Sequence, residues 1–497
     1  MRERKVILNA VTSVFQVVAS SVILFVLYKY LIKTIGISNF GIWSLIVAVS
    51  SMTRIAGLGL EGSIVKYVAK YIALEDMRKV CQVIETAITS VGIIFIPVLL
   101  LVYPLIKMYL VTVVEKNALS LALSILPLAC VAFWALMVTR VMQAGLDGNE
   151  SITHRNLILL WSSFSHLILC ILFAPQYGLM GVAYARVIQN FMTMIISWIV
   201  LKNQIKSLPP IPYRWHKDII LEIYKYTFNI QIISLLTIIE EPVTKGLLTK
   251  FGSLSMVGYY EMANRLVKQF RAMIVSANQV LVPAFAHLTE VKSEKIIFIY
   301  QASYNTIFFI SLFVFSSIIV AAPLISTLWI GQYVAIFISF LILLSVGYYL
   351  NLLNVPAFYA NLGVGNLRWN VIGNSVNALV NLGCGLLLGY MFGGKGVVFA
   401  RVIALILGSG IIYISYHIIN NIPLSALLPK KTRLLLILCF FSILITYVIQ
   451  NLEVHSIRMI LYQSLMPVTF YLITGFYFWN HPLRKKIYRW FGLLFTR

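Results

Sequence analysis

A twelve-residue stretch occurs twice in this chain, and its repetition constrains the fold more than any other feature. The sequence YGLMGVAYARVI at residues 177–188 returns as FGGKGVVFARVI at 392–403, with seven identical positions at an offset of 215. Further pairs lie at nearly the same offset: Gly36 with Gly252, Gly41 with Gly258, Arg54 with Arg271, Gly148 with Gly365, and Asn149 with Asn366. The common offset predicts an internal duplication, which is the usual architecture of secondary transporters.

Composition predicts that the duplicated units are bundles of membrane-spanning helices. Hydrophobic residues make up 60% of the chain, charged residues 11%, and the mean hydropathy is +0.90. A helix needs roughly 20 apolar residues to cross the hydrocarbon layer. Hydropathy predicts about fourteen such spans, near 6–32, 40–60, 83–108, 118–143, 156–174, 178–201, 222–248, 256–280, 298–322, 333–355, 370–391, 396–419, 432–450 and 457–479. The expected fold is an all-α polytopic membrane protein.

The spans group into two repeats and an additional pair. Six spans per repeat is an even number, so both repeats enter the membrane with the same orientation and form parallel six-helix bundles. We expect these bundles at 1–201 and 218–420, joined by a proline-containing cytoplasmic linker at 202–217. An appended pair of spans at 421–480 and a basic tail at 481–497 complete the predicted organisation.

The distribution of positive charge predicts orientation. Lys and Arg concentrate in loops on the side of the N-terminus, which predicts that both termini lie in the cytoplasm. The first residues are interpreted as the start of the first span and not as a secretory signal, because the apolar run is long and no cleavage site follows it. The net charge of +23 is spread along loop margins, so it indicates anionic lipids as partners and no nucleic acid.

Motifs of enzymes and metal sites are not found in the sequence. The five cysteines show no metal-ligand spacing, and we expect no disulfide, metal or cofactor. The chain also lacks a phosphate-binding loop of the P-loop type, so ATP hydrolysis is not expected. We therefore predict no catalytic residues and no enzymatic activity.

Several turn sequences resemble a known family. These are NFGIW at 39–43, GLG at 57–59 and LSMVGYYEMANR at 254–265. They are similar to the polysaccharide-transport branch of the multidrug/oligosaccharidyl-lipid/polysaccharide exporter (MOP) superfamily, whose best-known members are Wzx-type O-antigen flippases. The resemblance covers most of residues 1–420. It implies two six-helix bundles that move a polyprenyl-pyrophosphate-linked oligosaccharide across the bacterial inner membrane by alternating access, with polysaccharide polymerase machinery as a candidate partner.

Polar stripes mark candidate substrate-binding faces. The first span carries Asn9, Thr12, Ser13, Gln16 and Ser20 at helical spacing, and the seventh carries Asn229, Ser234, Thr237, Glu241 and Thr244. The eleventh carries Asn366, Asn370, Asn374, Asn377 and Asn381. Amides donate and accept hydrogen bonds and suit sugar hydroxyls. The alternative is hydrogen bonding between close-packed helices.

Charged side chains at membrane depth are the second group of candidates. Each costs at least ~2.5–3.5 kcal/mol near the bilayer centre, so a partner, a cavity or a function must compensate. Arg54, Arg265 and Arg271 are candidates to hold a pyrophosphate, with a structural ion pair such as Arg265 with Glu241 as the alternative. We expect three further arginines to be anchors that extend toward the membrane boundary: Arg140, Arg186 and Arg401.

Two adjacent carboxylates, Glu240 and Glu241, are candidates for coupling transport to H+ or Na+. Pro242 frees backbone carbonyls that can assist a cation. The alternatives are a salt bridge with an arginine or packing at the edge of a cavity.

Three function classes compete. A flippase for lipid-linked oligosaccharides needs a hydrated cationic cavity, which the arginines and polar stripes favour. A cation-coupled multidrug antiporter of the same superfamily would need acidic or aromatic cavity positions and few buried arginines. A membrane glycosyltransferase, polymerase or ligase would need catalytic groups on sizeable outer loops, which are short here.

Overall fold

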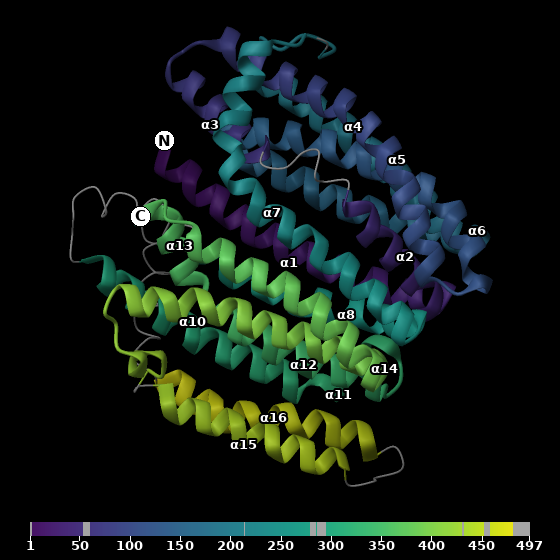
Figure 1. Cartoon of the computed structure of the whole chain (residues 1–497), viewed down its shortest axis with the longest axis vertical. Coiled ribbons are helices and arrows are strands. Elements are labelled where there is room, and N and C mark those ends of the chain that lie inside the picture. The colour runs from purple at the N-terminus through teal and green to yellow at the C-terminus, as the bar shows by residue number, and fades with distance from the viewer. Residues whose placement is uncertain are drawn as a thin grey trace. The chain divides into compact units, whose positions relative to one another are not determined.

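The chain folds into helices, as its computed structural model shows (Figure 1). The structure describes residues 2–52, 60–212, 214–278, 285, 295–429, 432–451 and 458–480. Its helices are α1 (Arg2–Ile35), α2 (Ile37–Ser50), α3 (Leu60–Ala73), α4 (Met77–Val113), α5 (Lys116–Gly148), α6 (Ile152–Gln204), α7 (Lys217–Phe251), α8 (Leu254–Asn278), α10 (Lys295–Val320), α11 (Ala322–Ile330), α12 (Ala335–Leu352), α13 (Val355–Val364), α14 (Arg368–Ile419), the 3-10 helix η2 (Leu424–Leu427), α15 (Arg433–Asn451) and α16 (Arg458–Asn480). No strand occurs in these ranges, and the all-α prediction is confirmed.

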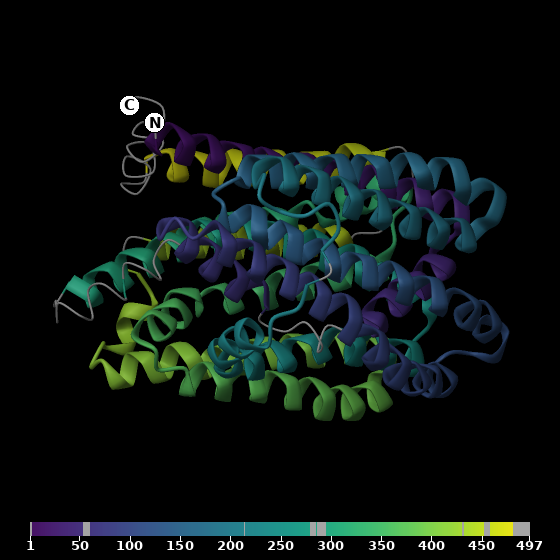
Figure 2. The ribbon, with the colours of Figure 1, turned by 90° about the horizontal axis from the view of Figure 1, so that it is seen from above.

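The helices form two compact units, Met1–Gly258 and Tyr259–Arg497. Within each unit the long helices run roughly parallel or antiparallel to one another (Figure 1, Figure 2). In the first unit, α6 packs against α1 and α5, while α7 packs against α2, α3 and α4. In the second unit, α12 packs against α10 and α14, and the appended pair α15–α16 packs against α10.

The division into units differs from the predicted bundle boundaries. It falls at Gly258, inside α8, because α7 packs on helices of the N-terminal repeat. The predicted linker at 202–217 does correspond to a break, since α6 ends at Gln204 and α7 begins at Lys217. The bundle limits of 1–201 and 218–420 remain a prediction.

Two unusually long helices, α6 and α14, each contain a reversal at an equivalent glycine. Gly178 has φ 54° and ψ −131°, and Gly393, 215 residues later, has φ 63° and ψ −150°. Side chains meet across each break: Gln189 donates to Ser162, and Arg401 donates to Asn377. In a straight helix residues 27 positions apart would be separated by about 40 Å. Each element is therefore a helical hairpin, and the repeated sequence forms its turn.

The glycine after each turn permits a close approach of the backbone. A Cβ on Gly181 would lie 2.2 Å from the carbonyl oxygen of Phe173, and one on Gly396 would lie 2.0 Å from that of Leu388. Both pairs of residues are again related by the offset of 215. Glycine at these positions in both copies of the repeat therefore has a steric cause, because any side chain there would force the two arms of the hairpin apart.

Seven described helical segments are long and apolar enough to cross a membrane. This number counts each hairpin once, although a 52- or 53-residue helix would measure about 80 Å if straight, far more than one crossing. Helices α2, α15 and α16 contain shorter apolar stretches. The chain therefore has the fold of a multi-pass membrane protein. The number of fourteen spans stays a prediction.

Candidate functional site

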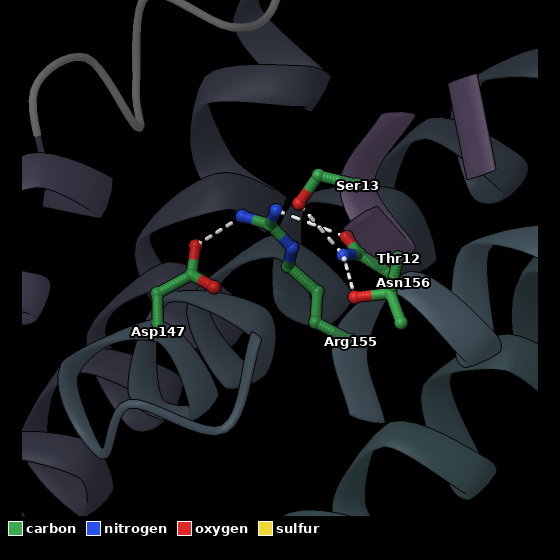
Figure 3. Close-up of polar contacts among 5 residues, drawn as sticks. All are labelled: Thr12, Ser13, Asp147, Arg155 and Asn156. Carbon is green, nitrogen blue, oxygen red and sulfur yellow. Dashed lines mark hydrogen bonds and ion pairs between the residues drawn. The ribbon is translucent and has the colours of Figure 1, made fainter. Parts of the chain in front are cut away.

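The polar stripe of α1 lies against α6 (Figure 3). Asn156 of α6, 2% exposed, donates from Nδ2 to Ser13 Oγ at 2.8 Å and to Thr12 Oγ1 at 3.3 Å. About two turns further along α1, Ser20 Oγ lies 3.1 Å from Ser163 Oγ of α6. These three members of the stripe therefore join two helices, as in the packing alternative.

The other members of the stripe have different surroundings. Gln16 is half-buried and donates from Nε2 to Ser20 Oγ at 3.0 Å, so its amide oxygen is available for a further hydrogen bond. Asn9 lies in α1, but its side chain is outside the described residues.

An ion pair that sequence reasoning missed continues this network. Arg155 binds the carboxylate of Asp147 through Nη1, and its Nη2 donates to Asn156 Oδ1 at 3.1 Å (Figure 3). Each partner keeps one buried atom without a hydrogen bond, Nε of Arg155 and Oδ1 of Asp147. The pair joins the end of α5 to the start of α6 across a short turn. Sequence reasoning did not single out this ion pair because both residues lie near predicted span boundaries, where charged residues are common.

A second group of charges lies on α7. Glu240 is 8% exposed and Glu241 is half-buried, while Lys245 is 3% exposed and donates from Nζ to the carbonyl of Ser44 at 3.2 Å. The carbonyl of Pro242 accepts a hydrogen bond from Tyr109 at 2.9 Å. Carboxylates and a buried ammonium therefore occupy one turn-and-a-half of the same helix. Lys245 was not among the predicted residues, because it sits near the expected end of its span.

The arginines of α8 both have polar partners. Arg265 Nε lies 3.4 Å from Glu261 Oε1, one turn earlier on the helix, and its side chain is 47% exposed. The pairing of Arg265 with Glu241, which the sequence suggests as an alternative, stays a prediction. Arg271 donates from Nε to Asn351 Oδ1 of α12 at 3.1 Å. With Lys268 the arginines lie at positions i, i+3 and i+6, within about 120° of the helix circumference.

The asparagine stripe of α14 is mostly buried inside the second unit. Asn370 is fully buried, donating to the carbonyl of Phe358 at 3.1 Å and accepting from Asn361 at 2.9 Å. Asn377 and Asn381 are 7% and 1% exposed. Asn370 therefore lies in the contact of α14 with α13, and Asn377 lies between the two arms of the hairpin. The role of this stripe in substrate binding stays a prediction. Asn374 is half-buried and donates to its own helix.

The repeated arginines are not the anchors that the sequence predicts. Arg401 is 5% exposed and donates from Nη1 to Asn377 Oδ1 at 3.1 Å. Its equivalent Arg186 donates to Gln189 Oε1 at 3.1 Å, and Gln189 in turn binds Ser162, the residue equivalent to Asn377. Arg401 thus binds across its hairpin, whereas Arg186 binds Gln189 of its own arm, which in turn binds the other arm. Arg140 forms an ion pair with Glu61 at 3.1 Å.

Three of the predicted residues fall on parts of the chain that the structure does not describe. Arg54 lies outside the described residues, and so do the side chains of Asn229 and Ser234 in α7. Within the described part of the chain, no cluster of three or more metal-ligating residues occurs.

Solved structures of other membrane proteins share the fold of this chain. An inward-facing multidrug resistance MATE family transporter of the MOP superfamily has a TM-score of 0.71 at 16% identity, with 80% of this chain and 94% of that chain covered. The lipid II flippase MurJ in an inward closed conformation has a TM-score of 0.73 at 14% identity, covering 95% and 99%. A MOP superfamily transporter from Pyrococcus furiosus has a TM-score of 0.54 at 14% identity, covering 84% and 94%. At these identities the likeness shows the fold.

The sequence itself identifies the family. The profile of the polysaccharide biosynthesis protein family matches residues 8–289, more than half of the chain, and the chain belongs to that family. No curated protein sequence matches it. The predicted resemblance is confirmed in that the chain belongs to the polysaccharide biosynthesis protein family and shares the fold of MOP-superfamily members.

Proposed function

We propose that the protein is a flippase that moves a polyprenyl-pyrophosphate-linked oligosaccharide across the bacterial cytoplasmic membrane, for the synthesis of an O-antigen or capsule-like surface polysaccharide. The observation that carries this proposal is the family match over residues 8–289 in a chain with a MOP-superfamily fold. The similarity to a lipid II flippase over nearly the whole chain supports a lipid-linked substrate.

The cationic face of α8 suits the anionic part of such a substrate. Arg265 keeps an exposed side chain although it is paired with Glu261, and Lys268 and Arg271 lie on the same part of the helix. A guanidinium can bind two oxygens of a pyrophosphate at once. Arg54 is proposed for the same role from its sequence position. Gln16 and Asn374, which are half-buried, and Asn9 are proposed to bind sugar hydroxyls.

The charged turn of α7 is proposed to couple transport to H+ or Na+. A carboxylate pair beside a buried ammonium can change protonation or bind a cation as its surroundings open and close. Glu240, Glu241 and Lys245 provide these groups. The same observation supports the second candidate function, a cation-coupled multidrug antiporter, because such a protein also needs membrane-embedded carboxylates.

The predicted topology completes the proposal. Both termini lie in the cytoplasm, anionic lipids surround the basic loop margins, and polysaccharide polymerase machinery uses the translocated product. The two repeats, at 1–201 and 218–420, move relative to each other to expose the substrate alternately to the two sides of the membrane.

A gene deletion in the native bacterium tests the proposal. The expected result is loss of the surface polysaccharide and accumulation of its lipid-linked repeat unit, both reversed by the wild-type gene. Unchanged surface polysaccharide together with increased sensitivity to cationic drugs would support the antiporter.

A further inference from the structure

A cavity of about 230 Å³ with both polar and apolar lining lies in the second unit, where α10 begins and α14 ends. It is lined by two tyrosines and a histidine, by polar side chains of α10, and by the η2 segment and the start of α15. The volume is far above the ~10–15 Å³ that one water molecule needs on this measure. The predicted topology places this end of the helices at the cytoplasmic surface of the membrane.

The floor of the cavity is fixed by internal hydrogen bonds. The Tyr300 hydroxyl and His417 Nε2 lie 2.9 Å apart, and the Tyr304 hydroxyl donates to the carbonyl of Leu427 at 3.1 Å. All three side chains are at most 3% exposed. His417 Nδ1 is buried and makes no hydrogen bond. The aromatic floor is therefore rigid and retains one unused polar atom.

The walls carry polar groups whose hydrogen-bonding capacity is unused. In the described part of the chain, no hydrogen bond or ion pair is made by the side chains of Gln301, Asn305, Ser425 or Arg433. Amides, a hydroxyl and a guanidinium can all donate to one acceptor group. Among the lining residues that the structure describes, Arg433 supplies the only formal charge, and none of them is a carboxylate. The cavity is thus complementary to an anion with several oxygens.

Apolar side chains beside the cavity indicate where such an anion comes from. Leu424, Leu428 and Leu434 are 54%, 53% and 50% exposed on the segments that form its rim. Exposed leucines next to a cation at the membrane boundary suit an acyl chain joined to an anionic headgroup.

We propose that this cavity binds the phosphate group of an anionic phospholipid headgroup, and so links the repeat helices α10 and α14 to the appended helix α15. Arg433 pairs with the phosphate, while Gln301, Asn305 and Ser425 donate hydrogen bonds to its oxygens or to the headgroup hydroxyls. The site is separate from the transported substrate and does not depend on the proposed function.

Lipid binding to the purified full-length protein tests the proposal. Native mass spectrometry in detergent would compare phosphatidylglycerol with phosphatidylcholine, first for wild type and then for Arg433→Gln. The matched control is Arg368→Gln, an exposed arginine at the start of α14. We expect wild type to prefer phosphatidylglycerol, and Arg433→Gln to weaken its binding at least about tenfold, because the variant loses the charge-assisted hydrogen bonds to the phosphate. The control variant should bind as wild type does.

Competition with inorganic phosphate distinguishes the two sources of a phosphate group. Phosphatidylglycerol that stays bound in millimolar phosphate supports the lipid as ligand, whereas displacement supports the same recognition chemistry for a free phosphate compound. Equal binding of both lipids by wild type would overturn the proposal without any variant. Unchanged affinity in Arg433→Gln and in a second variant, Asn305→Ala, would overturn it too and leave a water-filled cavity.

Discussion

The hydroxyl oxygens of Ser38 and Ser255 lie 2.8 Å apart, and the two residues occupy equivalent positions of the internal repeat, 217 residues apart. The contact around them is reciprocal. A Cβ on Gly41 would lie 1.9 Å from the carbonyl oxygen of Leu254, and one on its equivalent Gly258 would lie 2.7 Å from that of Ile37. Ile37 and Leu254 are themselves equivalent. When residue i contacts residue j, and the equivalent of i contacts the equivalent of j, the two segments are related by two-fold symmetry. A local pseudo-two-fold axis therefore passes between the first turns of α2 and α8.

The first prediction concerns the close packing at this axis. Gly41→Ala should destabilise the protein by about 1–3 kcal/mol, because the added methyl group overlaps a backbone carbonyl that cannot move freely. The measurement is the apparent unfolding temperature in detergent. Gly62→Ala is the control, since Gly62 is also helical but has nothing within 4 Å of the added atom. Equal behaviour of the two variants would contradict the reciprocal contact.

The second prediction concerns motion at the same contact. If α2 and α8 separate during transport, the double variant Ser38→Cys with Ser255→Cys should lose surface polysaccharide under oxidising conditions and regain it on reduction. A disulfide needs Cβ atoms roughly 3.5–4.5 Å apart, which bridging hydroxyls at 2.8 Å make feasible. Each single cysteine variant should be unaffected by oxidant. A cross-linked protein with full activity would show that the contact stays closed throughout the cycle.

The third prediction concerns the cationic face of α8. Arg265→Ala should abolish polysaccharide export while the protein still reaches the membrane, and Arg265→Lys should restore export only in part because the bidentate fork is lost. Complementation with quantification of the membrane-embedded protein measures both. Arg368→Ala, at an exposed helix start, is the control. Loss of Arg265→Ala from the membrane would instead indicate that the pair with Glu261 is structural.

The fourth prediction concerns the hairpin of α14. Asn377→Leu should lower stability by ~1–3 kcal/mol, because it leaves the buried guanidinium of Arg401 without one of its acceptors. In a double-mutant cycle with Arg401→Met the two changes should be non-additive by at least ~0.5 kcal/mol. Asn374→Leu, whose amide bonds only its own helix, should cost less. Additive effects would mean that the hydrogen bond contributes little.

The sequence predicted the elements that depend on local pattern. Apolar length indicated the long helices, and the predicted spans break at 174–178 and 391–396, beside the glycines at 178 and 393 where the positive φ turns each hairpin. Both features follow from sterics and hydropathy within a short segment, so no knowledge of the partner helices is needed.

The partners of the polar stripes could not be predicted in the same way. A stripe of amides shows which face of a helix avoids lipid, but not whether water or another helix covers that face. For Asn377 the partner is Arg401, 24 residues away across a turn, and for Ser13 it is Asn156 on another helix. Arg401 lies close enough to an expected membrane boundary that outward extension was the simpler interpretation. Its burial became visible only with the hairpin's two arms in place.

The most direct test of the proposed function is translocation by the purified protein. Proteoliposomes would carry a fluorescent polyprenyl-pyrophosphate-linked oligosaccharide, and a membrane-impermeant quencher would report how much of it faces outward. We expect the wild-type protein to bring the fraction accessible to quencher close to completion, while Arg265→Ala proteoliposomes resemble protein-free liposomes. Wild-type proteoliposomes that match protein-free liposomes, under a proton gradient, a sodium gradient and no gradient alike, would contradict the account.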